Sequence, residues 1–112
     1  MAKGDLLGEF ELYVMLALAH LGPRGDEAYG AAIRREIARR TGRDAVIGAV
    51  YATLARLEAK HLVRHALSDP VPVPGGRARK CFRLTPAGER ALAESTSMFA
   101  RMLKGWRPRQ AD

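Results

Sequence analysis

The 112-residue sequence predicts a mainly α-helical fold with one small β-hairpin. Apolar residues recur at helical spacing in four segments, which glycine and proline separate. After the third segment, the stretch from Arg79 to Leu84 alternates charged and apolar residues with a period of two, as a half-buried strand does. Helices followed by a hairpin with a basic tip are typical of a winged helix-turn-helix.

A first helix is expected from Leu7 to Leu21, where apolar side chains occur almost all round the helix. A helix that is apolar on more than one face needs more than one partner. We expect one face to pack on the core of the domain and another, which includes Phe10, to pack on a second subunit. The glycines and proline of residues 22–25 end this helix.

The next two segments predict a helix-turn-helix. A second helix from about Glu27 to Thr41 has its apolar side chains inward and its arginines outward, where they either contact a DNA backbone or are simply solvated. A third helix from Ile47 to Lys60 has an apolar face and a second face that combines small residues with cations. That second face consists of Ala49, Ala52, Thr53, Arg56 and Lys60.

Such a narrow, cationic face suits the major groove of DNA, where Thr and Arg side chains can contact base edges. An ordinary amphipathic surface helix has the same composition, so this helix alone does not decide the function. The hairpin strengthens the interpretation, because Arg77, Arg79 and Lys80 follow the glycines of its turn and offer charge to phosphates or to the minor groove. The alternative for the hairpin is a solvated loop whose charges only aid solubility.

The fourth helix is expected to begin at Thr85-Pro86, since threonine can cap a helix and proline suits its first position. The residues of one stripe on this helix then follow each other at helical spacing, and we name them the seam: Leu92, Ser95, Phe99, Met102 and Trp106. The seam spans only about two heptads, so we expect it to form a dimer together with the first helix. The expected division is a winged helix-turn-helix domain at residues 1–84, a dimerisation helix at 85–107 and a tail at 108–112.

Composition narrows the class of function. The net charge of +7 favours a polyanionic partner, for which double-stranded DNA is the obvious candidate. We expect a cytoplasmic protein without a membrane partner, because the sequence has neither a spanning segment nor a secretory signal. The single Cys81 excludes an internal disulfide and a multi-cysteine metal site, and core packing is its favoured role.

The sequence indicates neither an enzyme nor a cofactor. His20, His61 and His65 are not arranged with a partnered nucleophile, and no residues have the spacing of metal ligands or of a phosphate-binding glycine loop. Carboxylates such as Glu9, Glu11, Glu36 and Glu58 have the spacing of helix surface residues. We therefore expect no catalytic residues, no metal and no cofactor.

Several strings, in this order, resemble the PadR family of bacterial transcriptional regulators. They are LGEFE at residues 7–11, AYGAAIRREI at 28–37, GAVYATLARLE at 48–58, GGRARK at 75–80 and RLTPAG at 83–88. The resemblance implies a homodimeric regulator, expected to be a repressor, whose recognition helix is residues 47–60. It further implies that Arg56 contacts base edges and that Tyr51 and Lys60 contact the phosphate side.

Two positions depart from the family pattern at the ends of the recognition helix. Members commonly place serine where Val46 stands and glycine where His61 stands. Here Asp44 or a backbone group must cap the helix instead, and His61 must adopt the left-handed conformation at a cost of roughly 1 kcal/mol. These changes affect the tilt of the helix rather than its outward face.

The short C-terminal segment resembles the subgroup of the family with a single last helix. In that subgroup the last helices of a dimer can enclose an apolar pore for aromatic or cationic compounds, and an aromatic residue can stack on the ligand. Phe99 stands at the matching place, near Met98, Met102 and Trp106. These four are the candidate effector-binding residues, although packing in the dimer core is their favoured role.

The expected function is sequence-specific regulation of transcription by a homodimer on an inverted-repeat operator, with a small apolar or aromatic effector as the releasing signal. Two alternatives stay open at this stage. A winged-helix domain can serve as a protein-interaction or dimerisation adaptor, and it can also be a non-specific architectural DNA binder. Cations on both the third helix and the hairpin favour the regulator.

Overall fold

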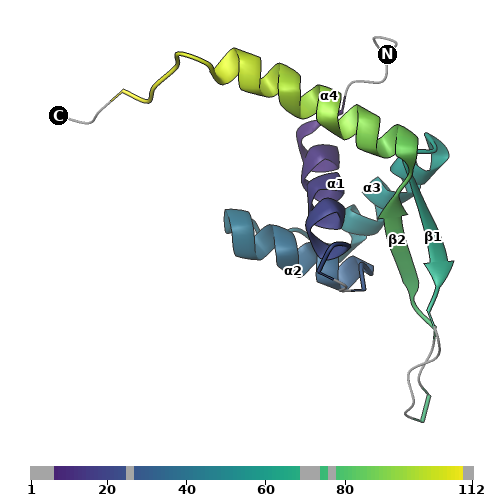
Figure 1. Cartoon of the computed structure of the whole chain (residues 1–112). Coiled ribbons are helices and arrows are strands. Elements are labelled where there is room, and N and C mark those ends of the chain that lie inside the picture. The colour runs from purple at the N-terminus through teal and green to yellow at the C-terminus, as the bar shows by residue number, and fades with distance from the viewer. Residues whose placement is uncertain (1–6, 25–26, 69–73, 76–77, 110–112) are drawn as a thin grey trace.

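The structure is a computed structural model that describes residues 7–24, 27–68, 74–75 and 78–109. It confirms the predicted fold class: four helices and a two-stranded antiparallel hairpin in the order of a winged helix-turn-helix (Figure 1). The elements are α1 (Glu9–Leu21), α2 (Gly30–Thr41), α3 (Ile47–Ala59), β1 (Val63–Leu67), β2 (Lys80–Leu84) and α4 (Pro86–Leu103).

The core lies around α1, which contacts α2, α3, β2 and α4. Figure 1 shows α4 crossing one end of α1 and α2 crossing the other end. The apolar faces predicted for α1 and α3 meet in this core, where Val14, Met15, Leu54 and Leu57 are fully buried. Each such side chain contributes roughly 1.5–3 kcal/mol on burial, so the contacts of α1 hold the three-helix unit together.

The hairpin is attached to the helices at its base. Val63 pairs with Leu84 and Leu67 with Lys80, and β2 begins at Lys80, one residue later than the alternation from Arg79 predicted. Phe82 is the buried residue of β2, and its amide donates a hydrogen bond to the carbonyl of Ala28 just before α2. This bond joins the hairpin to the start of the helix-turn-helix.

The joint between α3, β1 and α4 depends on two backbone positions. His61 has φ +62, which confirms the left-handed conformation expected of it. Thr85 then joins α4 to this turn, because its hydroxyl donates to the carbonyl of His61 and accepts from the amide of Gly88. A Cβ atom at Gly88 would lie 2.0 Å from the Leu62 carbonyl oxygen, so only glycine permits this approach.

Of the two caps expected for α3, the structure has the backbone one: the Asp44 carboxylate pairs with Arg34 at 2.8 Å, and the carbonyl of the N-cap residue Val46 accepts from the amides of Ala49 and Val50. The end of α4 differs from the expectation. The last helix ends at Leu103 rather than at residue 107, since Gly105 takes a left-handed conformation with φ +84. Trp106 therefore lies beyond α4, and the prediction that it continues the seam on that helix was wrong.

Within the described part of the chain, no helix combines the length and the apolar character that crossing a membrane requires.

Candidate nucleic-acid interface

The exposed side of α3 is narrow over its first two turns. Gly48, Ala49 and Ala52 are exposed there, and Tyr51 is 45% exposed. The Tyr51 ring lies over Gly30 at the start of α2, where an added Cβ atom would be 2.4 Å from the Tyr51 Cζ atom. Gly30 therefore allows α2 and α3 to approach closely, and this approach fixes the position of Tyr51 on the surface.

Thr53 does not lie on this exposed side. It is 1% exposed, because the buried stripe of α3 runs through Val50, Leu54 and Leu57 and position 53 falls within it. The sequence interpretation that placed the Thr53 side chain among the outward residues was wrong. Its hydroxyl instead accepts a hydrogen bond from the Arg56 guanidinium at 3.0 Å, which orients the exposed Arg56.

Lys60 lies just beyond the last residue of α3 and pairs with a carboxylate of α1. Its Nζ atom is 3.0 Å from Glu11 Oε2. Burial opposes ionisation of Glu11, but the amide of Gly8 and the ammonium of Lys60 outweigh it and lower the pKa of this carboxyl group. Lys60, predicted to contact phosphate, is thus held against α1 in the free protein.

The other end of α3 is joined to the same turn of α1. Arg43, in the link between α2 and α3, lies 3.2 Å from Glu9 Oε1, and its guanidinium covers the Phe10 ring at 4.8 Å from the centroid. The first turn of α1 therefore contacts the residues that flank α3 on both sides, Arg43 before its start and Lys60 after its end. Phe10, predicted at the dimer interface, is half-buried beneath Arg43 within its own chain.

The described cations of the hairpin are exposed. Arg79 and Lys80 lie at the start of β2, whereas Arg77 lies outside the described residues. The backbone of Arg79 exchanges hydrogen bonds with Ser68 where the two strands lead into the turn of the hairpin. The Arg79 guanidinium lies 4.4 Å from the centroid of the Tyr29 ring, so it is oriented toward the start of α2. Sequence reasoning placed Tyr29 inward and missed this contact.

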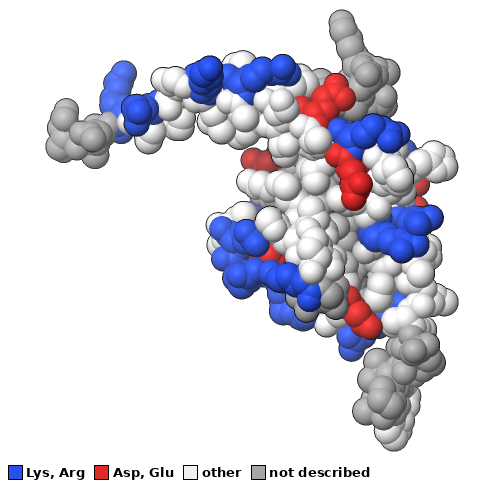
Figure 2. Space-filling model, viewed as in Figure 1, with Lys and Arg blue, Asp and Glu red and all other residues white. Residues whose placement is uncertain are grey.

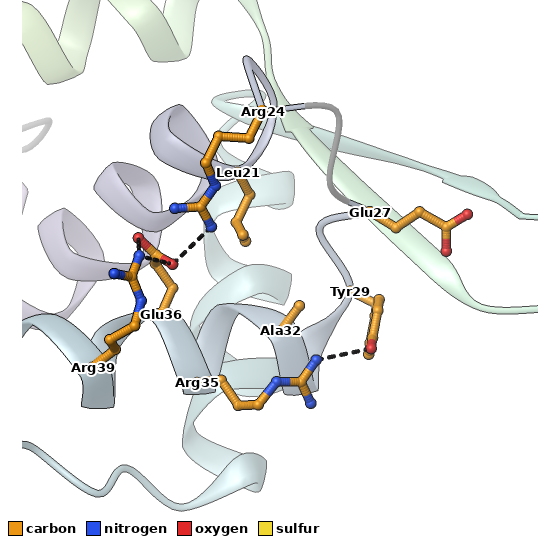
Figure 3. A pocket seen from close by; sticks show the side chains of 8 residues that line it. All are labelled: Leu21, Arg24, Glu27, Tyr29, Ala32, Arg35, Glu36 and Arg39. Carbon is orange, nitrogen blue, oxygen red and sulfur yellow. Dashed lines mark hydrogen bonds and ion pairs between the residues drawn. The ribbon is translucent and has the colours of Figure 1, made fainter.

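Figure 2 shows Lys and Arg side chains gathered over α2, and Figure 3 shows the pocket beneath some of them. Glu36 is 3% exposed and pairs with three guanidinium groups, from Arg39, Arg40 and Arg24, at 2.6–3.0 Å. Hydrogen bonds from Arg39 and Arg40 lower the pKa of Glu36 to about 2. The expectation that Glu36 is a surface carboxylate was wrong, and this buried anion organises the arginines predicted to point outward.

The residues predicted for dimerisation divide into two groups. Leu92 is 8% exposed and belongs to the core of its own chain. It is therefore not available to a second subunit, and its prediction as a dimerisation residue was wrong. Phe99, Met102 and Trp106 are 63%, 82% and 63% exposed, and Met98 is 39% exposed. Large apolar side chains thus gather on the second half of α4 and just after it.

Of these apolar residues, Phe99 lines a groove between α1 and the projecting half of α4. Its volume is about 510 Å³, and its walls include Leu12 and Leu16 from α1 and Phe99 and Leu103 from α4. Apolar side chains line it predominantly, with Glu9 and Thr96 as polar members. Such a lining suits an apolar or aromatic molecule, or the apolar face of another helix.

Other chemistry-bearing residues form no site. No group of His, Cys, Asp and Glu in the described ranges has the geometry to hold a metal ion. Burial raises the pKa of the partly buried Cys81 thiol, which keeps it protonated. His65 lies 2.6 Å from Glu58 and beside the Phe82 ring, with no nucleophile in the pair.

A model of the transcriptional regulator PadR-like family matches residues 17–94. The chain belongs to this family. Its members are transcriptional regulators and not enzymes. The PadR-like chain is 42% identical to the transcriptional regulator Rv3488 of Mycobacterium tuberculosis over 69 residues, which are 62% of this chain and 60% of that protein. The match therefore spans less than two thirds of this relative's length.

Solved structures of PadR family regulators share the fold. One from Clostridium difficile covers 87% of this chain and 93% of its own with a TM-score of 0.69 at 24% identity. Another, from Eggerthella lenta, covers 86% of this chain and 82% of its own with a TM-score of 0.65 at 27% identity. The PadR-like chain thus has the winged-helix architecture over most of its length.

Proposed function

We propose that this PadR-like chain is a sequence-specific DNA-binding regulator, acting as a repressor, that binds an inverted-repeat operator as a homodimer and is released by a small apolar or aromatic effector. The observation that carries the proposal is the outward side of α3. Small residues let it approach the floor of a groove, and Arg56 is held on it by the buried Thr53 hydroxyl.

The proposed DNA contacts follow from exposure and orientation. Arg56 reaches base edges, and the exposed Tyr51, near the start of the same helix, contacts the backbone. Arg79 and Lys80 contact phosphates next to the recognition helix, together with Arg77 outside the described residues. Lys60 contributes once DNA competes with Glu11 for its ammonium group.

The homodimer is supported by the apolar side chains of α4. Phe99 and Met102 are exposed to water in a monomer. A second copy that covers them removes their apolar surface from water, and this burial stabilises the dimer. A two-fold dimer presents two recognition helices related by symmetry. Its operator is therefore an inverted repeat with half-sites about one helical turn apart, or a multiple of it, on the order of 10 base pairs per turn.

The effector would occupy the groove between α1 and α4. Its volume of about 510 Å³ is that of a small-molecule site, and Phe99 offers an aromatic face on its wall. Met98, Met102 and Trp106 are also exposed on the same segment, and we propose that they complete the site in the dimer. In a dimer the partner's α4 would close the groove, so the ligand and the dimer interface share the same residues.

The test is electrophoretic mobility of the protein with its own upstream DNA, with and without an excess of random competitor DNA. A regulator retains the upstream fragment against competitor. An architectural binder loses it, and an adaptor never binds it. Arg56→Ala should weaken discrimination between operator and random DNA by roughly 1–3 kcal/mol. An equal loss for both DNAs would assign Arg56 to the backbone instead.

A further inference from the structure

Tyr29 stands between two guanidinium groups at the junction of three elements. It precedes α2 as the N-cap residue, and its hydroxyl accepts a hydrogen bond from Arg35 Nη2 at 2.9 Å (Figure 3). The Arg35 and Arg79 guanidinium carbons lie 5.6 Å and 4.4 Å from the ring centroid. A residue of α2 and a residue of the hairpin therefore converge on one phenol.

The chemistry of this cluster is that of an anion site. Arginine has donors and no acceptor, so neither guanidinium can take the proton of the Tyr29 hydroxyl. Among the residues that the structure describes, that O–H group has no acceptor, so it is a donor beside two positive charges. The hydrogen bond from Arg35 also lowers the pKa of Tyr29, which reflects the positive potential at the hydroxyl oxygen. An acceptor with negative charge is the complement of such a group.

The neighbourhood extends this positive character along α2. The adjoining pocket has a volume of about 430 Å³ and is lined by Arg24, Arg35 and Arg39 as well as by Tyr29. Glu36 at its floor is already paired with arginines, and the Glu27 side chain points away from Arg35 in Figure 3. Three arginines against two carboxylates leave the lining of this pocket with a net positive charge.

The cluster also adjoins the recognition helix. Gly30, the residue after Tyr29, lies under the ring of Tyr51 on α3. Arg79 lies at the end of the hairpin strands next to the turn. The phenol thus lies where the start of α2, the outward side of α3 and the hairpin meet, which is beside any duplex that α3 enters.

We propose that Tyr29, Arg35 and Arg79 form a binding site for one phosphate group, which the DNA backbone supplies when the recognition helix lies in the major groove. The inference rests on the proposed function, adds Tyr29, which the sequence did not single out for DNA contact, and assigns Arg35 a phosphate contact where the sequence left backbone contact and solvation open. Tyr29 donates its hydroxyl proton to a phosphate oxygen while Arg35 and Arg79 neutralise the charge. The site joins α2 and the hairpin to one phosphate and so sets the register of the recognition helix.

The experiment compares Tyr29→Phe and Arg35→Gln with wild type in salt titrations against the upstream fragment and against random DNA. Tyr29→Phe keeps the ring between the guanidiniums and removes one neutral donor. It should weaken both complexes about 10-fold with no change in the salt dependence. Arg35→Gln should weaken both and flatten the slope of log affinity against log salt by about 0.9 for each subunit.

Arg101→Gln is the matched control, because Arg101 is an exposed arginine on α4, away from the cluster. It should leave affinity and slope as in wild type. Thermal unfolding of each variant shows whether the fold is intact. Wild-type affinity and slope in both cluster variants would overturn the inference while leaving the proposed function standing. Failure of the wild-type protein to bind DNA would overturn the proposed function and the DNA source together.

A second arm separates a DNA phosphate from a free one. Inorganic phosphate is titrated into wild type and Tyr29→Phe, with binding followed by calorimetry at low salt. We expect inorganic phosphate not to bind in the micromolar range, because one phosphate contact is weak alone and contributes to affinity only together with the other contacts to the duplex. Tight phosphate binding that Tyr29→Phe abolishes, with DNA binding unchanged, would make this a site for a small anion and overturn the DNA assignment.

Discussion

The two halves of α4 have the same helical periodicity and opposite relations to the rest of the chain. In the first half, Gly88, Ala91, Leu92 and Ser95 are buried against the chain's own fold. In the second half, Phe99 and Met102 continue the stripe at the same spacing and are mostly exposed. A periodic apolar stripe therefore shows which side of a helix avoids water, but it does not show which partner covers that side.

The largest expected effect lies in the first half, at Gly88. Gly88→Ala places a Cβ atom 2.0 Å from a backbone oxygen that cannot move aside, so we expect a loss of about 3 kcal/mol in the free energy of unfolding, or no folding. Gly48→Ala is the matched control, since nothing lies within 4 Å of its Cβ position, and it should be neutral or stabilising by up to about 1 kcal/mol. Urea denaturation measures both. Equal stability of the two variants would contradict the contact between Gly88 and Leu62.

The next effect tests whether Leu92 belongs to one chain. Leu92→Ala opens a cavity in the core and should lower the free energy of unfolding by roughly 2–3 kcal/mol. Because the contact is within the chain, the loss should be the same at every protein concentration. A loss that shrinks as the protein is diluted and the dimer dissociates would return Leu92 to the dimer interface.

Phe99 tests the second half. Phe99→Glu places a charge on the surface that we propose a second subunit covers, so self-association should weaken at least roughly 30-fold, as for an interface residue worth 2 kcal/mol. Sedimentation velocity over a range of concentrations measures it, and circular dichroism should show unchanged helix content. A monomeric wild type, or a variant as dimeric as wild type, would contradict the proposed dimer.

The smallest effect lies at the boundary between the halves. The Ser95 hydroxyl is buried without a hydrogen-bond partner among the described residues. Removing it in Ser95→Ala should leave stability unchanged or raise it by up to about 1 kcal/mol. Thermal unfolding at two concentrations measures this change. A loss confined to high concentration, where the dimer is populated, would show that the hydroxyl finds its partner in a second subunit, and would move the boundary one turn toward Leu92.

The recognition helix shows what local patterning could predict and what it could not. The stripe of Val50, Leu54 and Leu57 was predicted from its spacing, and all three are fully buried. Thr53 lies on the edge of that stripe, where spacing assigns either side equally well. Its burial was decided by the neighbouring elements around α3, and the hydrogen bond to Arg56 followed from it.

Charged residues diverged further from the sequence interpretation. Lys60 and Glu11 are 49 positions apart, and Arg43 and Glu9 are 34 apart, so no local pattern links them. Glu36 has the spacing of a surface carboxylate, but three guanidiniums gather on it and make its burial as an anion affordable. Tyr29, Arg35 and Arg79 likewise meet only because the fold packs the residue just before β2 against the start of α2.

By itself the sequence determined the order of helices and strands, the apolar side of each helix, the basic hairpin and the left-handed turn at His61. These depend on interactions within a few residues, such as hydrogen bonds along a helix, period-two alternation and steric limits on φ. Only the tertiary structure decided that Leu92 packs in the core of its own chain, that α4 ends before Trp106 and that cations such as Lys60 and Arg43 face a particular carboxylate or ring. Such choices depend on which distant surfaces meet, and the free energy of that meeting is shared among elements that no local pattern connects.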